Sequence, residues 1–157
     1  MHSSVSILIP IFNFDVRPLV NDLHGQCEAC AIAYEILCFD DGSTPQFKML
    51  NKEIWKLPNV IYRDMPQNLG RSAIRNALSR AARFEQLLFM DCDSKVVSTD
   101  FIKNYLTHAA PNCLVYGGRC YQASPPTMQR FVFTGTMAAN GNKPPPPSAA
   151  AHPTVVL

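Results

Sequence analysis

The chain has 157 residues, of which 47% are hydrophobic, which is enough for one domain with a hydrophobic core. Its formal net charge is only +2 and its 14 basic residues are scattered, so the sequence offers no basic stripe for nucleic acid or for an anionic membrane surface. No apolar run approaches the roughly 20 residues that a transmembrane helix needs, so we expect no membrane-spanning segment and a cytoplasmic protein, with peripheral contact at the inner face of the membrane as the alternative.

The first predicted element is a strand at residues 5–12, a short β-branched and apolar run that the turn-forming Asn13 closes. A helix is predicted over about residues 15–31, because Pro18 is tolerated in a first turn and apolar residues follow on one side. The next apolar run, residues 34–39, predicts a second buried strand.

Acidic and turn-forming residues, Asp40-Asp41-Gly42-Ser43, follow the second predicted strand. Taken alone, this segment also fits a turn with a helix cap. Thr44 then supplies an N-cap and Pro45 a first helical position, so a helix is predicted up to Pro58. A third strand is predicted at residues 59–62.

The helix with the clearest pattern opens at Gly70, and its apolar residues recur at helical spacing at Ile74, Ala77, Leu78, Ala81 and Ala82. A fourth strand is predicted at residues 87–90, and Ser98 is predicted to cap a further helix. Residues 113–116 predict a fifth strand before Gly117-Gly118.

Strands that alternate with helices predict an α/β fold, with right-handed βαβ units on a mainly parallel sheet. We expect one domain over residues 1–130. Residues 131–157 are predicted to form a disordered tail, because Pro144-Pro145-Pro146-Pro147 and a run of alanines show no helix or strand period.

Polar residues follow the predicted strands at the edge where parallel α/β sheets bind ligands. Asn13 follows the first strand, Asp40 and Asp41 the second, and Asp91 and Asp93 the fourth. In β conformation Asp91 and Asp93 would point to the same side and hold a cation, since hard divalent cations prefer carboxylate oxygen. The sequence therefore predicts a polar binding site at the carboxyl ends of the strands.

Four segments together resemble the successive signatures of family 2 glycosyltransferases of the GT-A fold. These segments are Val5-Ser6-Ile7-Leu8-Ile9-Pro10, Asp40-Asp41-Gly42-Ser43, Asn68-Leu69-Gly70-Arg71-Ser72-Ala73-Ile74-Arg75-Asn76 and Asp91-Cys92-Asp93. Their order and spacing match the family over about residues 4–120. The resemblance implies a Rossmann-like, three-layer α/β/α domain that transfers a sugar, with inversion, from a nucleotide-diphosphate sugar, commonly a uridine diphosphate (UDP) sugar. It also implies Mg²⁺ or Mn²⁺, a glycan or lipid-linked acceptor, and a role in cell-envelope polysaccharide biosynthesis.

The resemblance implies roles for individual residues around the nucleoside. Pro10 and Phe12 match the segment that lines the base, where an aromatic face can pack against a planar ring. Asp41 matches the carboxylate that accepts a hydrogen bond from the uracil imide, with Asp40 beside it. The remaining residues assigned to the donor in this part of the site are Asn13, Asn68 and Gly70.

The resemblance also implies roles around the diphosphate. Arg71 and Arg75 match the basic part of the third segment and would balance phosphate charge, although two arginines four residues apart on a helix are often solvated. Asp91 is placed toward the ribose and the metal, and Asp93 is the better candidate for direct coordination of the cation.

In this family the general base is an acidic residue that follows the last of these segments, but here no Asp or Glu occurs after Asp100. We therefore identify no catalytic base. We expect a domain that is incomplete at the acceptor side, with a truncation or a frameshift near residues 130–134.

Two alternatives remain open. The first is a non-catalytic module that binds a nucleotide sugar without turnover. The second is a phosphohydrolase of the haloacid dehalogenase type with Asp91 as nucleophile, which the lack of acidic residues after Asp100 disfavours.

The six cysteines are interpreted as reduced thiols, because the sequence shows no secretory leader. Cys27 and Cys30 form an incidental pair, since no second pair follows at zinc spacing. The four histidines lie far apart in the sequence and are given no role.

Overall fold

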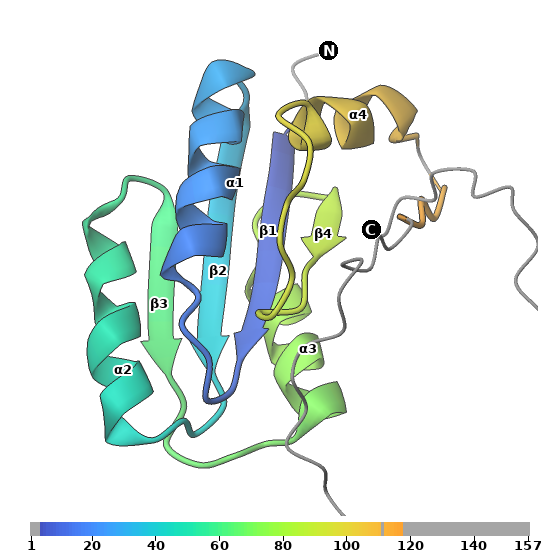
Figure 1. The fold of residues 1–157 in the computed structure, drawn as a ribbon. Helices are drawn as coiled ribbons and strands as arrows, with labels where there is room; N and C mark the ends of the chain where they lie inside the picture. Colours follow the sequence, from blue (N-terminus) through green and yellow to red (C-terminus); the bar gives the residue numbers. More distant parts are fainter. Residues whose placement is uncertain (1–3, 111, 118–157) are drawn as a thin grey trace, which may run out of the picture.

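The computed structural model describes residues 4–110 and 112–117 (Figure 1). Four strands alternate with helices along this part of the chain, as predicted. In chain order the elements are β1 (Ser4–Ile11), α1 (Arg17–Ala29), β2 (Ala33–Asp40), α2 (Pro45–Asn51), the 3₁₀ helix η1 (Lys52–Lys56), β3 (Val60–Asp64), α3 (Arg71–Ala81), β4 (Leu87–Phe89) and α4 (Phe101–His108). Among the described residues, no helix has both the length and the apolar character needed to cross a bilayer.

The strands form one parallel sheet in the order β3-β2-β1-β4. Ile11 at the end of β1 lies opposite Asp40, and Asp40 lies opposite Asp64 at the end of β3. The chain builds outward from β1 through β2 to β3, and then returns to place β4 on the other side of β1. The direction of building therefore reverses between β1 and β4, which is where open α/β sheets bind their ligands.

Helices cover both faces of the sheet, so the domain has the three predicted layers (Figure 1). Alternate residues of each strand point to opposite faces. On one face, β1 packs against α1 and α4 in a core that includes Ile7, Ile9, Val20, Leu23 and Ile102. On the other face, the strand residues Leu8, Leu37 and Phe39 pack against Ile74 and Leu78 of α3. The continuous apolar runs of β1 and β2 follow from this burial on both faces.

The predicted helix up to Pro58 is shorter in the structure. It ends at Asn51, and the chain tightens into η1. Asn51 is fully buried, and its side chain accepts a hydrogen bond from the Val16 N–H (3.0 Å) and donates one to the Phe14 carbonyl (2.8 Å). The end of α2 is thereby tied to the loop that follows β1.

The predicted fifth strand at residues 113–116 is wrong within the described part of the chain, where only Gly117 takes part in an isolated bridge. Leu114 is 80% exposed and Tyr116 is 58% exposed, so no neighbouring strand or helix among the described residues covers this apolar run. The predicted domain boundary at residue 130 and the tail at residues 131–157 lie outside the described residues.

Ser98 does not occupy the N-cap of α4, which is Asp100. The Ser98 hydroxyl instead accepts a hydrogen bond from the Asp100 N–H (3.2 Å), just before the helix. A backbone N–H group in the first turn of α4 finds its acceptor on another helix, because the Gln26 side chain of α1 accepts a hydrogen bond from the Ile102 N–H (3.1 Å).

Candidate functional site

The sequence-predicted residues gather at the carboxyl ends of β1, β2 and β4, the edge toward which the strand arrows point in Figure 1. The loops after these strands supply them, together with the loop that opens α3. β1 lies between β2 and β4, and β4 is the shorter strand, since it ends at Phe89 opposite Leu8 whereas β2 ends at Asp40 opposite Ile11.

Asp41 anchors the loop that starts α3. Its side-chain oxygens accept hydrogen bonds from the backbone N–H groups of Leu69 (2.6 Å) and Gly70 (3.0 Å), and its carbonyl accepts one from the Asn68 side chain (2.7 Å). Asp41 is only 5% exposed, so its charge is stabilised mainly by these donors. Each carboxylate oxygen has a second lone pair, and the group therefore retains capacity for a ligand donor.

Two glycines make this arrangement possible. Gly42 has φ +85° and Gly70 has φ +83°, in the left-handed region that side chains disfavour. A Cβ on Gly42 would also lie 3.2 Å from the Asn68 backbone nitrogen. The turn after Asp41 and the loop before α3 therefore fit together only because residue 42 lacks a side chain.

Asp40 has a different environment from its neighbour. It is fully buried, with one oxygen accepting from the Ser43 N–H (2.7 Å) and the other from the Tyr62 hydroxyl (2.9 Å). Burial and the hydrogen bond to Asp40 raise the pKa of Tyr62 well above its usual value. Asp40 thus closes the turn after β2 and links it to β3. Because no surface of Asp40 is left for a ligand, we exclude it from the proposed donor contacts.

Asn13 joins the loop after β1 to the loop after β2. Its N–H donates to the Ser43 hydroxyl (2.8 Å), and its side-chain oxygen accepts from the Thr44 N–H (2.8 Å). Thr44 does occupy the predicted N-cap of α2, but its own side chain makes no capping hydrogen bond. Asn13, with φ +49°, accepts from the N–H of Thr44 itself and so fixes the residue that precedes α2 from across the site.

Two aromatic rings are exposed beside this network. Phe12 is 52% exposed and Phe14 is 41% exposed, whereas Pro10 is half-buried at the end of β1. The loop that carries the rings is fixed at one end by Asn13 and at the other by Asn51. It therefore presents flat apolar surface in a defined position.

The segment Asp91-Cys92-Asp93 lies beyond the end of β4, in a turn. The Ser94 N–H donates to the Asp91 carbonyl (3.0 Å) and bends the chain there. The predicted extended geometry, with both carboxylates on one side of a strand, is therefore wrong. Asp93 is exposed, whereas the Asp91 side chain is 25% exposed.

Cys92 connects this turn to the loop after β1. Burial raises the pKa of the Cys92 thiol, and a hydrogen bond with the backbone of Phe12 partly offsets that effect. The contact joins the loops on either side of the point where the strand order reverses.

Arg75 of α3 forms an ion pair with Asp91. The side chains are 32% and 25% exposed, so the pair is screened less than a surface pair. The Arg75 Nε is buried and has no hydrogen-bond partner among the described residues. Arg71, one turn earlier, is exposed. Of the two arginines, among the described residues only Arg75 forms an ion pair with an acidic residue of the site.

The residues present fit a divalent cation in part. Among the described residues, no three His, Cys, Asp or Glu side chains are grouped closely enough to hold a metal ion by themselves. Mg²⁺, however, is commonly held by one or two carboxylates together with water and substrate phosphates. Asp93, with Asp91 nearby, offers oxygen donors of that kind at the carboxyl edge.

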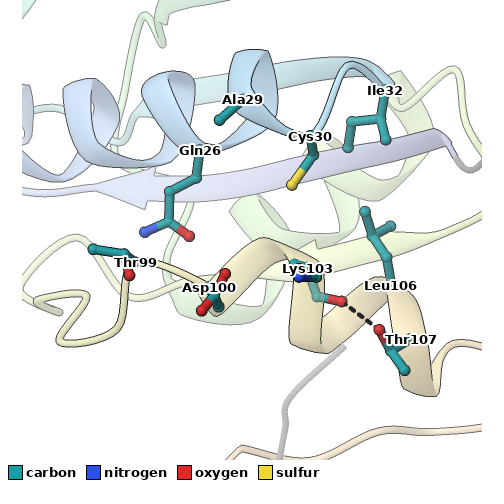
Figure 2. Close-up of a pocket in the computed structure, with 9 residues that line it drawn as sticks. All are labelled: Gln26, Ala29, Cys30, Ile32, Thr99, Asp100, Lys103, Leu106 and Thr107. Carbon is teal, nitrogen blue, oxygen red and sulfur yellow. Dashed lines mark hydrogen bonds between the residues drawn. The ribbon is translucent and has the colours of Figure 1, made fainter.

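A hollow of about 580 Å³ lies at the opposite edge of the sheet, between the end of α1 and α4 (Figure 2). Gln26, Cys30 and Lys103 are among its lining residues, and none of the sequence-predicted site residues lines it. Gln26 also donates a hydrogen bond to the Ser98 carbonyl (2.9 Å), which indicates a seam between packed elements. We therefore locate the candidate site by its side chains and loops and not by this hollow.

A family model described as "Glycosyl transferase family 2" matches residues 6–138 of the chain. A poly(ribitol-phosphate) beta-glucosyltransferase from Bacillus spizizenii is 31% identical over an alignment of 110 positions, which covers 64% of this chain and 16% of the relative.

Two solved structures are similar in fold. TarS from S. aureus in complex with UDP-GlcNAc has a TM-score of 0.54 at 22% identity, covering 67% of this chain and 30% of that one. The mannosyltransferase PcManGT from Pyrobaculum calidifontis, in complex with GDP-Man and Mn²⁺, has a TM-score of 0.57 at 18% identity, covering 75% of this chain and 35% of that one. These likenesses confirm the GT-A fold. The chain spans about a third or less of the length of each of these relatives.

Proposed function

The chain belongs to glycosyl transferase family 2, and we propose that the carboxyl edge of its sheet binds a uridine diphosphate sugar as the donor for transfer to a glycan or lipid-linked acceptor. The structures similar in fold support a nucleotide-sugar donor, since one is in complex with UDP-GlcNAc and another with GDP-Man and Mn²⁺. The location we propose is the cytoplasm, and the process is cell-envelope polysaccharide biosynthesis.

The observation that carries this proposal is the position of Asp41. Its buried carboxylate is held by the backbone of Leu69 and Gly70 at the carboxyl end of β2. A carboxylate fixed in this way can accept a hydrogen bond from a uracil imide without first losing side-chain freedom. Phe12 and Pro10, at the end of the neighbouring strand, supply apolar surface for the base.

The diphosphate belongs at the other side of β1 in this proposal. Because β1 lies between β2 and β4, the nucleoside diphosphate would extend from Asp41 across the end of β1 toward Asp93. Asp93 would hold Mg²⁺ or Mn²⁺, and Arg71 offers an exposed positive charge for the phosphates. The bound cation would neutralise the charge that develops on the leaving diphosphate.

We assign the described residues to the donor half of an inverting reaction and name no general base among them. The family assignment replaces the phosphohydrolase alternative. A transfer and donor-hydrolysis assay distinguishes the proposed enzyme from the alternative, a binding module without turnover.

Calorimetric titration of the 157-residue chain with UDP, with and without Mn²⁺, tests the proposal. We expect saturable binding that Mn²⁺ strengthens, and we expect Asp93→Asn to remove the Mn²⁺ effect while binding without metal is kept. The exposed Asp22 of α1 gives the matched control Asp22→Asn, which should behave as the unaltered chain. No binding of UDP with Mn²⁺ would contradict the proposal. A transfer and donor-hydrolysis assay beside it distinguishes an enzyme from a binding module.

A further inference from the structure

The ion pair between Arg75 and Asp91 joins two segments of the site that are separate in the sequence, residues 68–76 and residues 91–93. Arg75 lies on the second turn of α3, and Asp41 fixes Leu69 and Gly70, the two residues that precede this helix. Asp91 lies in the turn after β4, on the far side of β1. Asp41, at the proposed nucleoside side of the site, is thus linked through α3 and Arg75 to Asp91, at the proposed diphosphate side.

The pair also makes the two aspartates of the turn unequal. Asp91 is three-quarters buried and already has a positive partner, whereas Asp93 is exposed. A guanidinium cannot lose its proton at any ordinary pH, so the positive charge beside Asp91 is permanent. That charge both engages a carboxylate oxygen and repels a second cation brought close to it.

We propose that Arg75 is a positioning residue that withholds Asp91 from the divalent cation, so that the cation binds weakly by itself and tightly only together with the donor diphosphate. The inference rests on the donor site proposed above, and it adds that tight binding of the cation depends on the nucleotide. The diphosphate supplies the negative charge and the oxygen ligands that Asp91 does not, and it is itself attracted by the arginine. The cation and the nucleotide therefore bind cooperatively.

The direction of the expected effect separates this role from a merely structural one. If Arg75 only stabilised the fold, its removal would weaken every binding event. If Arg75 withholds Asp91, removal takes away the positive partner of that carboxylate and a charge that repels the cation, so the cation alone should bind more tightly. For partly screened groups we expect a gain of at least about threefold.

The test is a titration of the full 157-residue chain with Mn²⁺ alone, in which free Mn²⁺ is followed by electron paramagnetic resonance. Arg75→Met keeps the aliphatic stem and should tighten Mn²⁺ binding. Arg75→Lys keeps the charge and should change it less. Asp91→Asn alone should weaken Mn²⁺ binding, because it leaves the guanidinium uncompensated, and it should remove the gain in the Arg75→Met background. The matched control is Arg80→Met, a loss of the same charge from an exposed position in the last turn of α3.

An unchanged or weaker Mn²⁺ affinity in Arg75→Met overturns the inference, as does an equal gain in Arg80→Met, which would reflect net charge alone. Circular dichroism of each variant identifies misfolding. If Arg75→Met is misfolded, Arg75→Lys decides, since in this variant UDP should strengthen Mn²⁺ binding less than it does in the unaltered chain. Binding of UDP with Mn²⁺ by the unaltered chain is measured first. If it is absent, the proposed function fails and the inference with it; if it is present and the Arg75 variants bind Mn²⁺ unchanged, only the inference fails.

Discussion

Alanine substitution should have three different effects on stability at Gly25, Gly70 and Gly42. Gly25 lies inside α1 with nothing within 4 Å of an added Cβ, so alanine there should stabilise the protein by about 0.5–1 kcal/mol. Gly70 also has open space, but it combines φ +83° with ψ 162°, a backbone conformation almost restricted to glycine, so alanine there should cost about 1–2 kcal/mol for the backbone alone.

Gly42 combines both penalties. Its φ of +85° carries a backbone cost of about 1–2 kcal/mol, and its added Cβ would lie 3.2 Å from the Asn68 nitrogen and 3.4 Å from the Asn68 Cβ. The neighbour that must move is backbone in the loop that Asp41 grips, so the strain cannot be relieved by a side-chain rotation. We expect Gly42→Ala to cost about 2–3 kcal/mol in total.

Urea unfolding followed by circular dichroism measures the series. With a dependence of about 2 kcal/mol per molar urea, Gly42→Ala should lower the midpoint by about 1 M or more, Gly70→Ala by less, and Gly25→Ala should raise it. Gly42→Ala should also weaken UDP binding, because the loop that it displaces holds the proposed nucleoside site. A Gly42→Ala protein as stable as Gly70→Ala would refute the close-contact argument.

Three further changes have separable outcomes. Tyr62→Phe should lower the free energy of unfolding by about 1 kcal/mol, measured by urea, because it leaves one oxygen of the buried Asp40 without its donor. For Glu35, burial acts to raise the pKa, but hydrogen bonds from Ser6 and Arg83 outweigh it and the pKa is lowered. Its contribution is therefore complete above the unfolded value of about 4.3 and is lost as the pH falls through the folded pKa, so thermal melts of Glu35→Gln should show reduced stability at neutral pH and a shallower acid decline. Phe12→Ala should weaken UDP binding by calorimetry while the melting temperature stays nearly constant, because the ring is half exposed.

The sequence was sufficient for the first four strands and for the edge at which the candidate site lies, but not for the strand predicted at residues 113–116. Continuous apolar runs such as residues 34–39 predict strands buried on both faces, and the residue that follows such a run must emerge at the carboxyl edge. Asp41 and Asn13 were located in this way, and the structure brings both into the loops of the site.

The contacts between loops were beyond sequence reasoning, because they join residues far apart in the chain. Arg75 meets Asp91 across 16 positions, and the Asn51 amide reaches the Phe14 carbonyl across 37. Neither residue breaks the pattern of its helix, so no local signal predicts either contact.

The adjacent Asp40 and Asp41 show the same limit at a single motif. The residues are identical in type, yet Asp40 is fully buried beneath the turn, and Asp41 anchors the loop before α3. Their division of roles depends on Tyr62 from β3 and on the backbone of residues 69 and 70, which only the folded sheet brings near.

The central claim is that Asp41 is the nucleoside anchor of a donor site, and the change in UDP affinity caused by Asp41→Asn tests it most directly. Calorimetry in the presence of Mn²⁺ would compare this variant with Asp22→Asn, the same change at an exposed position of α1. We predict that Asp41→Asn weakens UDP binding by on the order of tenfold or more, since a hydrogen bond to a charged group is lost, and that Asp22→Asn leaves it unchanged. An Asp41→Asn protein that remains folded and binds UDP as tightly as the unaltered chain would contradict the account.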